Sequence, residues 1–191
     1  MPDQLTPFSI LILAGGRGQR MGGQDKGLIH WQGRPMIEWV HGVVRPLTDD
    51  LIISCNRNAE PYSVYADRLF ADDDATFEGP LAGIRAGLRN ARHSQLLVLP
   101  CDAPRVDQTL IEEIISRCGQ HPVIVKSGGW IEPLFCLIPT LLNNDLELQW
   151  RSGQRSPQRW LSSHAPVFIE CPTDDPRLSN FNTPQSLLVV K

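Results

Sequence analysis

Long apolar runs alternate along the chain with segments whose apolar residues recur at helical spacing. The apolar runs lack polar alternation, which is typical of strands buried on both faces, and they occupy 8–14, 50–56, 68–72, 95–102, 122–128, 132–139 and 167–171. Helical spacing and helix-start signals predict helices at 35–44, 79–92, 107–119, 140–150, 156–163 and 183–190. This alternation predicts an α/β fold, a three-layer α/β/α sandwich with a mostly parallel, Rossmann-like central sheet.

Turn and cap residues support these boundaries. Ser156 followed by Pro157 is typical of a helix start, and Gly119 closes the helical pattern at 107–119. The pair Gly128 and Gly129 predicts a tight turn between the strands at 122–128 and 132–139.

Length and composition limit the classes of protein that the chain can represent. Its 191 residues predict one domain spanning 1–191. The net charge of −3 argues against nucleic acid as a partner, and no apolar run approaches the roughly 20 residues that cross a bilayer. The N-terminus has no secretory signal, and the five cysteines are scattered without metal or redox spacing. We therefore expect a cytoplasmic protein with reduced thiols.

Polar residues follow the apolar runs at several strand ends. Open parallel sheets bind ligands beyond the carboxyl ends of their strands. That rule places the stretches at 13–27, 54–57, 71–74 and 100–104 on one rim of the sheet. Four polar strand ends on one rim indicate a binding site.

The first of these stretches, LAGGRGQRMGGQDKG, is rich in glycine and cations. The dinucleotide pattern G-x-G-x-x-G fails because its third glycine is replaced by Met21, and no Gly-Lys-Ser/Thr sequence marks a P-loop. Gly15 and Gly16 nevertheless allow backbone N–H groups to approach phosphate oxygens, and Arg17, Arg20 and Lys26 can supply positive charge. The stretch therefore predicts a triphosphate site, with Asp25 available to hold Lys26 or the loop in place.

This stretch resembles the signature L-A-G-G-x-x-x-R-M-G-x-D-K of the nucleotidyltransferases that activate sugars and cofactors. Within that superfamily the chain is most similar to the molybdenum cofactor guanylyltransferases. The sequences Asn56-Arg57, GPLAG at 79–83, PCDAP at 100–104 and NFNTP at 180–184 recur in that family in this order and cover nearly the full chain.

The resemblance implies a set of site residues. It assigns catalysis to Arg20, Lys26 and Asp102, with Asp102 as the Mg²⁺ ligand, and the second substrate to Asn180 and Asn182. The implied nucleotide-binding residues are Leu13, Ala14, Gly15, Lys26, Ser54, Asp72 and Asp102.

Some of these assignments depend on particular chemistry. A carboxylate at Asp72 can accept hydrogen bonds from both N1–H and the exocyclic amine of guanine. Ser54 is a departure, because the family typically has asparagine there, and a serine reaches less far. Asn56 is either an additional contact or an ordinary turn residue.

The implied reaction transfers GMP from GTP to molybdopterin carrying its metal, which forms molybdopterin guanine dinucleotide and pyrophosphate. The implied partners are GTP and the molybdenum cofactor, with cofactor-insertion proteins and apo-molybdoenzymes as further candidates. Three alternatives stay open at this point: a cytidylyltransferase, a sugar-phosphate nucleotidyltransferase of the same superfamily, and a nucleotide-binding module without catalysis.

Overall fold

The computed structural model describes residues 7–15, 24–71 and 78–181. The predicted site residues Arg20, Asp72 and Asn182, and the predicted helix at 183–190, lie outside the described residues.

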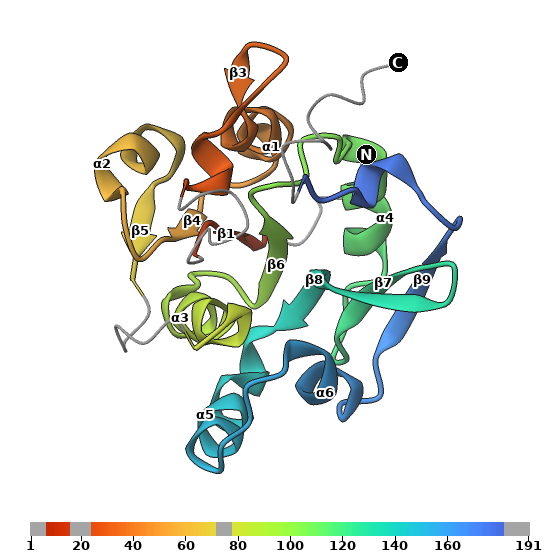
Figure 1. Ribbon diagram of the computed structural model, residues 1–191. Helices are drawn as coiled ribbons and strands as arrows, with labels where there is room; N and C mark the ends of the chain where they lie inside the picture. The colour runs from red at the N-terminus through yellow and green to blue at the C-terminus, as the bar shows by residue number, and fades with distance from the viewer. Residues whose placement is uncertain (1–6, 16–23, 72–77, 182–191) are drawn as a thin grey trace.

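A seven-stranded sheet forms the centre of the molecule (Figure 1). β8 is antiparallel to both of its neighbours, β6 and β7, whereas every other adjacent pair is parallel, so the predicted mostly parallel sheet is confirmed. In spatial order the strands are β5 (Arg68–Phe70), β4 (Leu51–Ser54), β1 (Ser9–Leu13), β6 (Gln95–Pro100), β8 (Trp130–Pro139), β7 (Val123–Ser127) and β9 (Val167–Cys171).

Helices cover both faces of this sheet, which confirms the three-layer prediction. One face carries α1 (Met36–Val44), α2 (Ala59–Tyr62) and α4 (Gln108–Ser116). The other carries α3 (Pro80–Asn90), α5 (Asn143–Arg151) and α6 (Pro157–Ser162).

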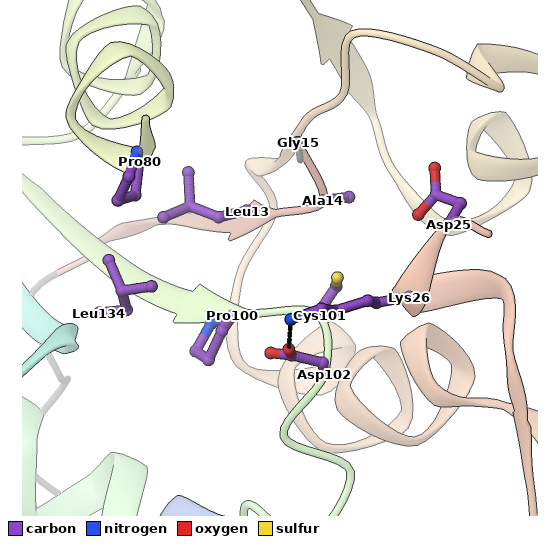
Figure 2. A pocket seen from close by; sticks show the side chains of 10 residues that line it. All are labelled: Leu13, Ala14, Gly15, Asp25, Lys26, Pro80, Pro100, Cys101, Asp102 and Leu134. Atoms are coloured by element: carbon purple, nitrogen blue, oxygen red, sulfur yellow. Dashed lines mark hydrogen bonds and ion pairs between the residues drawn. The ribbon is translucent and has the colours of Figure 1, made fainter. Parts of the chain in front are cut away.

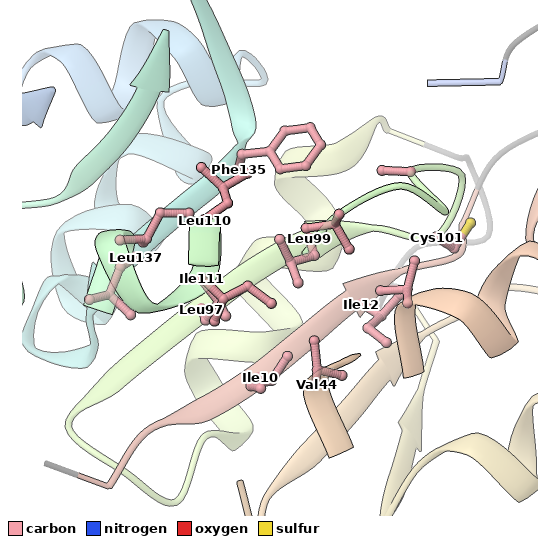
Figure 3. Packing of buried hydrophobic residues seen from close by; sticks show 14 of the residues in the cluster. Ile10, Ile12, Val44, Leu97, Leu99, Cys101, Leu110, Ile111, Phe135 and Leu137 are labelled. Atoms are coloured by element: carbon pink, nitrogen blue, oxygen red, sulfur yellow. The ribbon is translucent and has the colours of Figure 1, made fainter. Parts of the chain in front are cut away.

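Alternation along each strand divides the core between the two faces. In β1, Ile10 and Ile12 belong to the cluster under α1 and α4, and Leu11 and Leu13 belong to the cluster under α3. Figure 3 shows the first cluster, where Leu97 of β6 packs near Ile111 of α4. Because every one of these strand residues is buried, the apolar runs show no polar alternation.

Several short elements lie between the predicted ones. A hairpin of β2 (His30–Trp31) and β3 (Arg34–Pro35) turns at Gln32 and Gly33, and α2 lies between β4 and β5. The predicted turn at Gly128 and Gly129 is confirmed, and both residues have positive φ. The 3₁₀ turns are η2 (Lys26–Leu28), η3 (Arg45–Leu47), η4 (Ser63–Tyr65), η5 (Thr140–Leu142) and η6 (Pro176–Leu178).

Backbone hydrogen bonds align the carboxyl ends of the first four parallel strands. Ala14 N–H donates to the carbonyl of Ser54, and Cys101 N–H donates to the carbonyl of Leu13. Cys55 N–H in turn donates to Phe70. The described parts of the predicted rim therefore lie side by side. Within the described ranges, no helix is both long enough and apolar enough to cross a membrane.

Candidate active site

A cavity of about 210 Å³ opens at this rim (Figure 2). It lies where β1 and β6 end, with η2, the start of α3 and a residue of β8 around it. Its lining consists of Leu13, Ala14, Gly15, Asp25, Lys26, Pro80, Pro100, Cys101, Asp102 and Leu134.

The cavity has an apolar end and a charged end. Figure 2 shows Leu13, Pro80, Pro100 and Leu134 together on one side, and Lys26 with Asp102 on the other. A flat apolar group fits between prolines and leucines, whereas a charged group requires the second region. The cavity therefore suits a ligand that is apolar at one end and ionic at the other.

Lys26 and Asp102 form an ion pair inside this cavity. The Lys26 Nζ lies 3.2 Å from Asp102 Oδ2, and the two side chains are 29% and 11% exposed. Lys26 begins η2, and Asp102 follows β6, so residues 76 positions apart meet here. The predicted convergence of the first strand–loop connection and the carboxylate after β6 is thus present in the fold.

Asp25 directs its carboxylate away from this pair and toward the α2 segment. Tyr62 Oη donates to Asp25 Oδ1 over 2.5 Å, and Asn58 Nδ2 donates to Oδ2 over 3.3 Å. Arg57 Nε lies 3.9 Å from the same oxygen. Of the two roles considered for Asp25, these contacts support that of holding the loop in place.

Two glycines beside the cavity have different structural reasons. Gly79 precedes α3 with φ of 89°, a conformation that favours glycine, and it presents Pro80 to the cavity. In α3, a Cβ at Gly83 would lie 2.6 Å from Leu13 Cδ2, so a larger residue there would require the Leu13 side chain or the helix to shift.

The predicted residues Ser54 and Asn180 occupy different surroundings. Ser54 ends β4, is 1% exposed, and has its hydroxyl beside Gly83, so it is not part of the cavity lining. Asn180 is next to Phe181, whose N–H donates to the carbonyl of Asp102 over 3.0 Å. The Asn180 Oδ1 is buried and has no hydrogen-bond partner among the described residues.

Asp102 is the described carboxylate best placed to hold a metal ion. Among the described residues no three His, Cys, Asp or Glu side chains converge. Mg²⁺ on a nucleotide needs only one or two carboxylates besides phosphate and water. The Asp102 Oδ2 already accepts a hydrogen bond from the Lys26 ammonium group inside the cavity. A cation at this point would therefore have the one carboxylate ligand that it needs.

Cys101 borders the cavity but is not suited to nucleophilic catalysis. Burial, reinforced by the neighbouring carboxylates of Asp102 and Asp25, raises the pKa of its thiol well above the ordinary value. A thiol in this state is not ionised near neutral pH, and only the thiolate is a good nucleophile.

Two residues at or next to the site, Leu134 and Tyr62, were not predicted from the sequence. Leu134 reaches the cavity from β8, where the pairing with β7 is irregular, and Tyr62 reaches Asp25 from α2. A period-two pattern does not reveal the irregular pairing, and a four-residue helix gives too short a pattern to detect.

Comparisons with known proteins agree on one family. The family model described as a MobA-like NTP transferase domain matches residues 10–167. A molybdenum cofactor guanylyltransferase of Ectopseudomonas mendocina is 61% identical over 95% of this chain and 90% of its own. Another, of Pseudomonas aeruginosa, is 59% identical over 98% of this chain and 96% of its own.

A solved structure extends the comparison to the fold. The crystal structure of molybdopterin-guanine dinucleotide biosynthesis protein A from Archaeoglobus fulgidus has a TM-score of 0.75 and 25% identity, and the match covers 94% of this chain and 95% of that one. A cytidylyltransferase from Thermus thermophilus has a TM-score of 0.71 at 17% identity, which shows the shared fold alone. The chain belongs to the MobA-like NTP transferase family, and within it to the molybdenum cofactor guanylyltransferases.

Proposed function

We propose that this nucleotidyltransferase transfers GMP from GTP to molybdopterin carrying its metal, yielding molybdopterin guanine dinucleotide and pyrophosphate. The observation that carries this proposal is the pairing of Lys26 with Asp102 in a cavity at the carboxyl edge of the sheet. A cation and a carboxylate side by side provide one group for phosphate and one for a phosphate-bound metal ion.

In the proposed reaction, the terminal phosphate of molybdopterin attacks the α-phosphorus of GTP. A new P–O bond forms, the bond from the α-phosphorus to the bridging oxygen breaks, and pyrophosphate leaves with that oxygen. The attacking phosphate is already an anion, so the reaction needs no general base. The task of the protein is to bring two anions together and to neutralise their charge.

Particular residues would divide this task. The backbone of Leu13, Ala14 and Gly15 would bind the nucleotide, and Lys26, together with Arg20, would bind its β- and γ-phosphates. The flexible lysine stem allows the ammonium group to exchange the Asp102 carboxylate for a phosphate oxygen. The base would lie at the apolar end, between Pro80 and Leu134.

Asp102 would hold Mg²⁺ in the loaded enzyme. When bound there, the metal would supply neutralisation of the phosphate charge. The Asp102 carbonyl, held by the N–H of Phe181, fixes the loop that carries this carboxylate. Asn180, adjacent in the chain, has an unpaired buried oxygen within the described residues, and we assign it with Asn182 to the molybdopterin side.

The same assignment implies a cellular compartment and protein partners for the enzyme. All five cysteines are free, which is consistent with the reducing cytoplasm. Because the product is a cofactor, its receivers would be cofactor-insertion proteins and apo-molybdoenzymes.

The direct test is to incubate the purified protein with GTP, Mg²⁺ and molybdopterin and to measure pyrophosphate. We expect pyrophosphate and molybdopterin guanine dinucleotide to form in equal amounts. Omission of molybdopterin is the control, since a nucleotidyltransferase without an acceptor has no transfer to perform. Pyrophosphate release no greater than in the absence of protein would reject the assignment.

The choice of nucleotide needs a separate experiment. Thermal unfolding with Mg²⁺ and each of GTP, CTP, ATP and UTP compares their affinities, because a ligand that binds the native state raises the unfolding temperature. We expect the largest shift with GTP. A larger shift with CTP would favour the cytidylyltransferase alternative.

A further inference from the structure

Lys26 has a neighbour whose side chain is engaged elsewhere. Asp25 directly precedes η2, the position at which an aspartate commonly accepts a hydrogen bond from the first backbone N–H groups of the turn. Its side chain makes no such capping bond. Its carboxylate instead binds Tyr62 and Asn58, from the α2 segment. The two segments are therefore joined through a tertiary contact at the residue next to Lys26.

Tyr62 is the most deeply buried member of this contact. The residue is fully buried, and its hydroxyl donates to Asp25 Oδ1 over 2.5 Å, across 37 positions of sequence. Burial, the nearby Cys101 and the hydrogen bond to Asp25 raise the pKa of Tyr62, so its hydroxyl stays protonated and available as a donor. The Asp25 side chain is only 4% exposed, so water cannot readily replace this donor.

The packing around the hydroxyl leaves little freedom. A Cβ at Gly27 would lie 2.5 Å from Tyr62 Oη and 3.1 Å from Cys101 Sγ. The chain thus has a glycine directly after Lys26, where the tyrosine hydroxyl passes close to the backbone. Contacts on both sides of Lys26, at Asp25 and at Gly27, therefore involve the same hydroxyl group.

We propose that Tyr62, acting through Asp25, is a positioning residue that fixes the backbone of Lys26 so that its ammonium group is held over the phosphate region of the cavity. Figure 2 shows the consequence of this arrangement: the Asp25 carboxylate and the Lys26 ammonium group point to different sides, and the ammonium group reaches Asp102. Tyr62 itself touches no substrate in this role. The inference rests on the proposed function, because it assigns Lys26 to the phosphates of the nucleotide.

The test is a double-mutant cycle that combines Tyr62→Phe with Lys26→Ala. Tyr62→Phe keeps the buried ring and removes only the donor. We expect it to lower kcat roughly tenfold in the presence of Lys26, since small misplacements of a charge-stabilising group reduce turnover strongly. In the Lys26→Ala background we expect a change in kcat of less than about twofold, because the positioned group is absent.

Tyr65→Phe is the matched control. Tyr65 lies three residues further on, outside the cavity lining, with its ring beside His41. The same substitution there is expected to leave kcat unchanged. Equal losses of kcat from Tyr62→Phe in both backgrounds would overturn the proposal, and so would near-normal turnover of Tyr62→Phe alone.

A second variant covers the case in which Tyr62→Phe does not fold. Asn58 has φ of 56°, so Asn58→Gly suits the backbone and removes a second hydrogen-bond donor to Asp25. We expect a smaller fall in kcat that is again absent without Lys26. The same loss with and without Lys26 would contradict the proposal.

A failure of the proposed function can be distinguished from a failure of the positioning role of Tyr62. If the unmodified protein shows no turnover with GTP and molybdopterin, the proposed function fails, and the cycle is measured by calorimetric binding of magnesium GTP instead. Weaker binding by Tyr62→Phe only when Lys26 is present would still support the positioning role. Equal weakening in both backgrounds would reject it.

Discussion

At the scale of single residues, Lys26 stands apart from the other lysines. The chain has three, Lys26, Lys126 and Lys191, and among the described residues only Lys26 lines the cavity. Lys126 lies on β7, where it pairs with Glu170 and covers the ring of Phe168. Lys126 therefore serves as a matched control for substitutions of Lys26.

We expect Lys26→Ala to lower the rate of pyrophosphate release by about 10²-fold or more, because the substitution removes charge stabilisation from the phosphates. Lys126→Ala removes an equal charge at a residue that does not line the cavity, and it is expected to leave the rate near normal. Steady-state kinetics with GTP and molybdopterin measures both variants. A similar rate for the two would remove Lys26 from the mechanism.

The cysteines give a second prediction at this scale. Cys118 is exposed, whereas Cys55, Cys101, Cys136 and Cys171 are buried. Burial raises the pKa of Cys101 and of Cys136, so their thiolate fraction at pH 8 is lower than that of an ordinary cysteine. We expect a chromogenic disulfide reagent to titrate one thiol quickly in the native protein and all five after unfolding. Rapid reaction of two or more native thiols would contradict the described burial.

At this scale, the shared rim of the stretches that carry Lys26 and Asp102 was predicted from the strand ends. Their catalytic roles were predicted from the resemblance of the surrounding motifs. Tyr62 was not predicted, because its partner Asp25 is distant in sequence and a single tyrosine carries no motif. The hydroxyl of Ser54 lies beside Gly83 of α3, and Ser54 is not among the residues that line the cavity.

At the scale of elements, substitution by alanine is expected to change the free energy of unfolding in opposite directions at two helical glycines. A Cβ at Gly83 of α3 would lie 2.6 Å from Leu13 Cδ2 and 2.9 Å from Ser54 Oγ, whereas one at Gly42 of α1 would meet nothing within 4 Å. We expect Gly83→Ala to reduce the free energy of unfolding by about 1–3 kcal/mol through overpacking.

We expect Gly42→Ala to increase the free energy of unfolding by roughly 0.5–1 kcal/mol, because alanine favours the helix and no contact opposes it. Urea denaturation measures both variants. Stabilisation by Gly83→Ala would show that α3 can move away from β1 without cost.

The elements themselves were predicted to different degrees. The central strands and the helices from α1 to α6, except α2, were predicted because their apolar patterns are long. The hairpin of β2 and β3 and the short α2 were not, since two- and four-residue elements give no period to detect. Tertiary contacts stabilise these pieces, such as the packing of Trp31 against Phe181 and of Tyr62 in the core.

At the scale of the whole molecule, the two edges of the sheet differ in their contacts. The carboxyl edge carries the cavity, and the opposite edge carries the buried Asp50. This carboxylate accepts hydrogen bonds from Ser9 Oγ, from the N–H of Arg92 and from the guanidinium of Arg68. Asp50 thereby links the starts of β1 and β5 to the end of α3, an arrangement that serves stability.

This network makes stability depend on pH in a defined direction. Burial opposes ionisation of Asp50, but the hydrogen bonds outweigh it and hold its pKa below the ordinary 3.8. The lowered pKa means that the charged carboxylate stabilises the native state above that value. The contribution is lost as the pH falls through the pKa of the folded protein.

We expect Asp50→Asn to reduce the free energy of unfolding at pH 7 by roughly 3 kcal/mol, since it replaces the buried charged acceptor of three hydrogen bonds with a neutral amide. The difference from the unmodified protein should shrink as the pH falls below 4. Asp49→Asn, at an 81% exposed side chain, is the control and should change little. Urea unfolding at several pH values, with magnesium GTP affinity measured alongside, tests whether the two edges act separately. A pH-independent difference would contradict the assigned cause.

The mutual neutralisation of Lys26 and Asp102 bears on the order in which ligands can enter. Magnesium alone would have to compete with an ammonium group for the carboxylate, and a bare nucleotide would have to compete with the carboxylate for the ammonium group. The magnesium nucleotide replaces both partners in one encounter, so neither side chain is left without a counter-ion. Free Mg²⁺ should therefore bind this protein weakly by itself, and saturation with metal should follow the concentration of GTP.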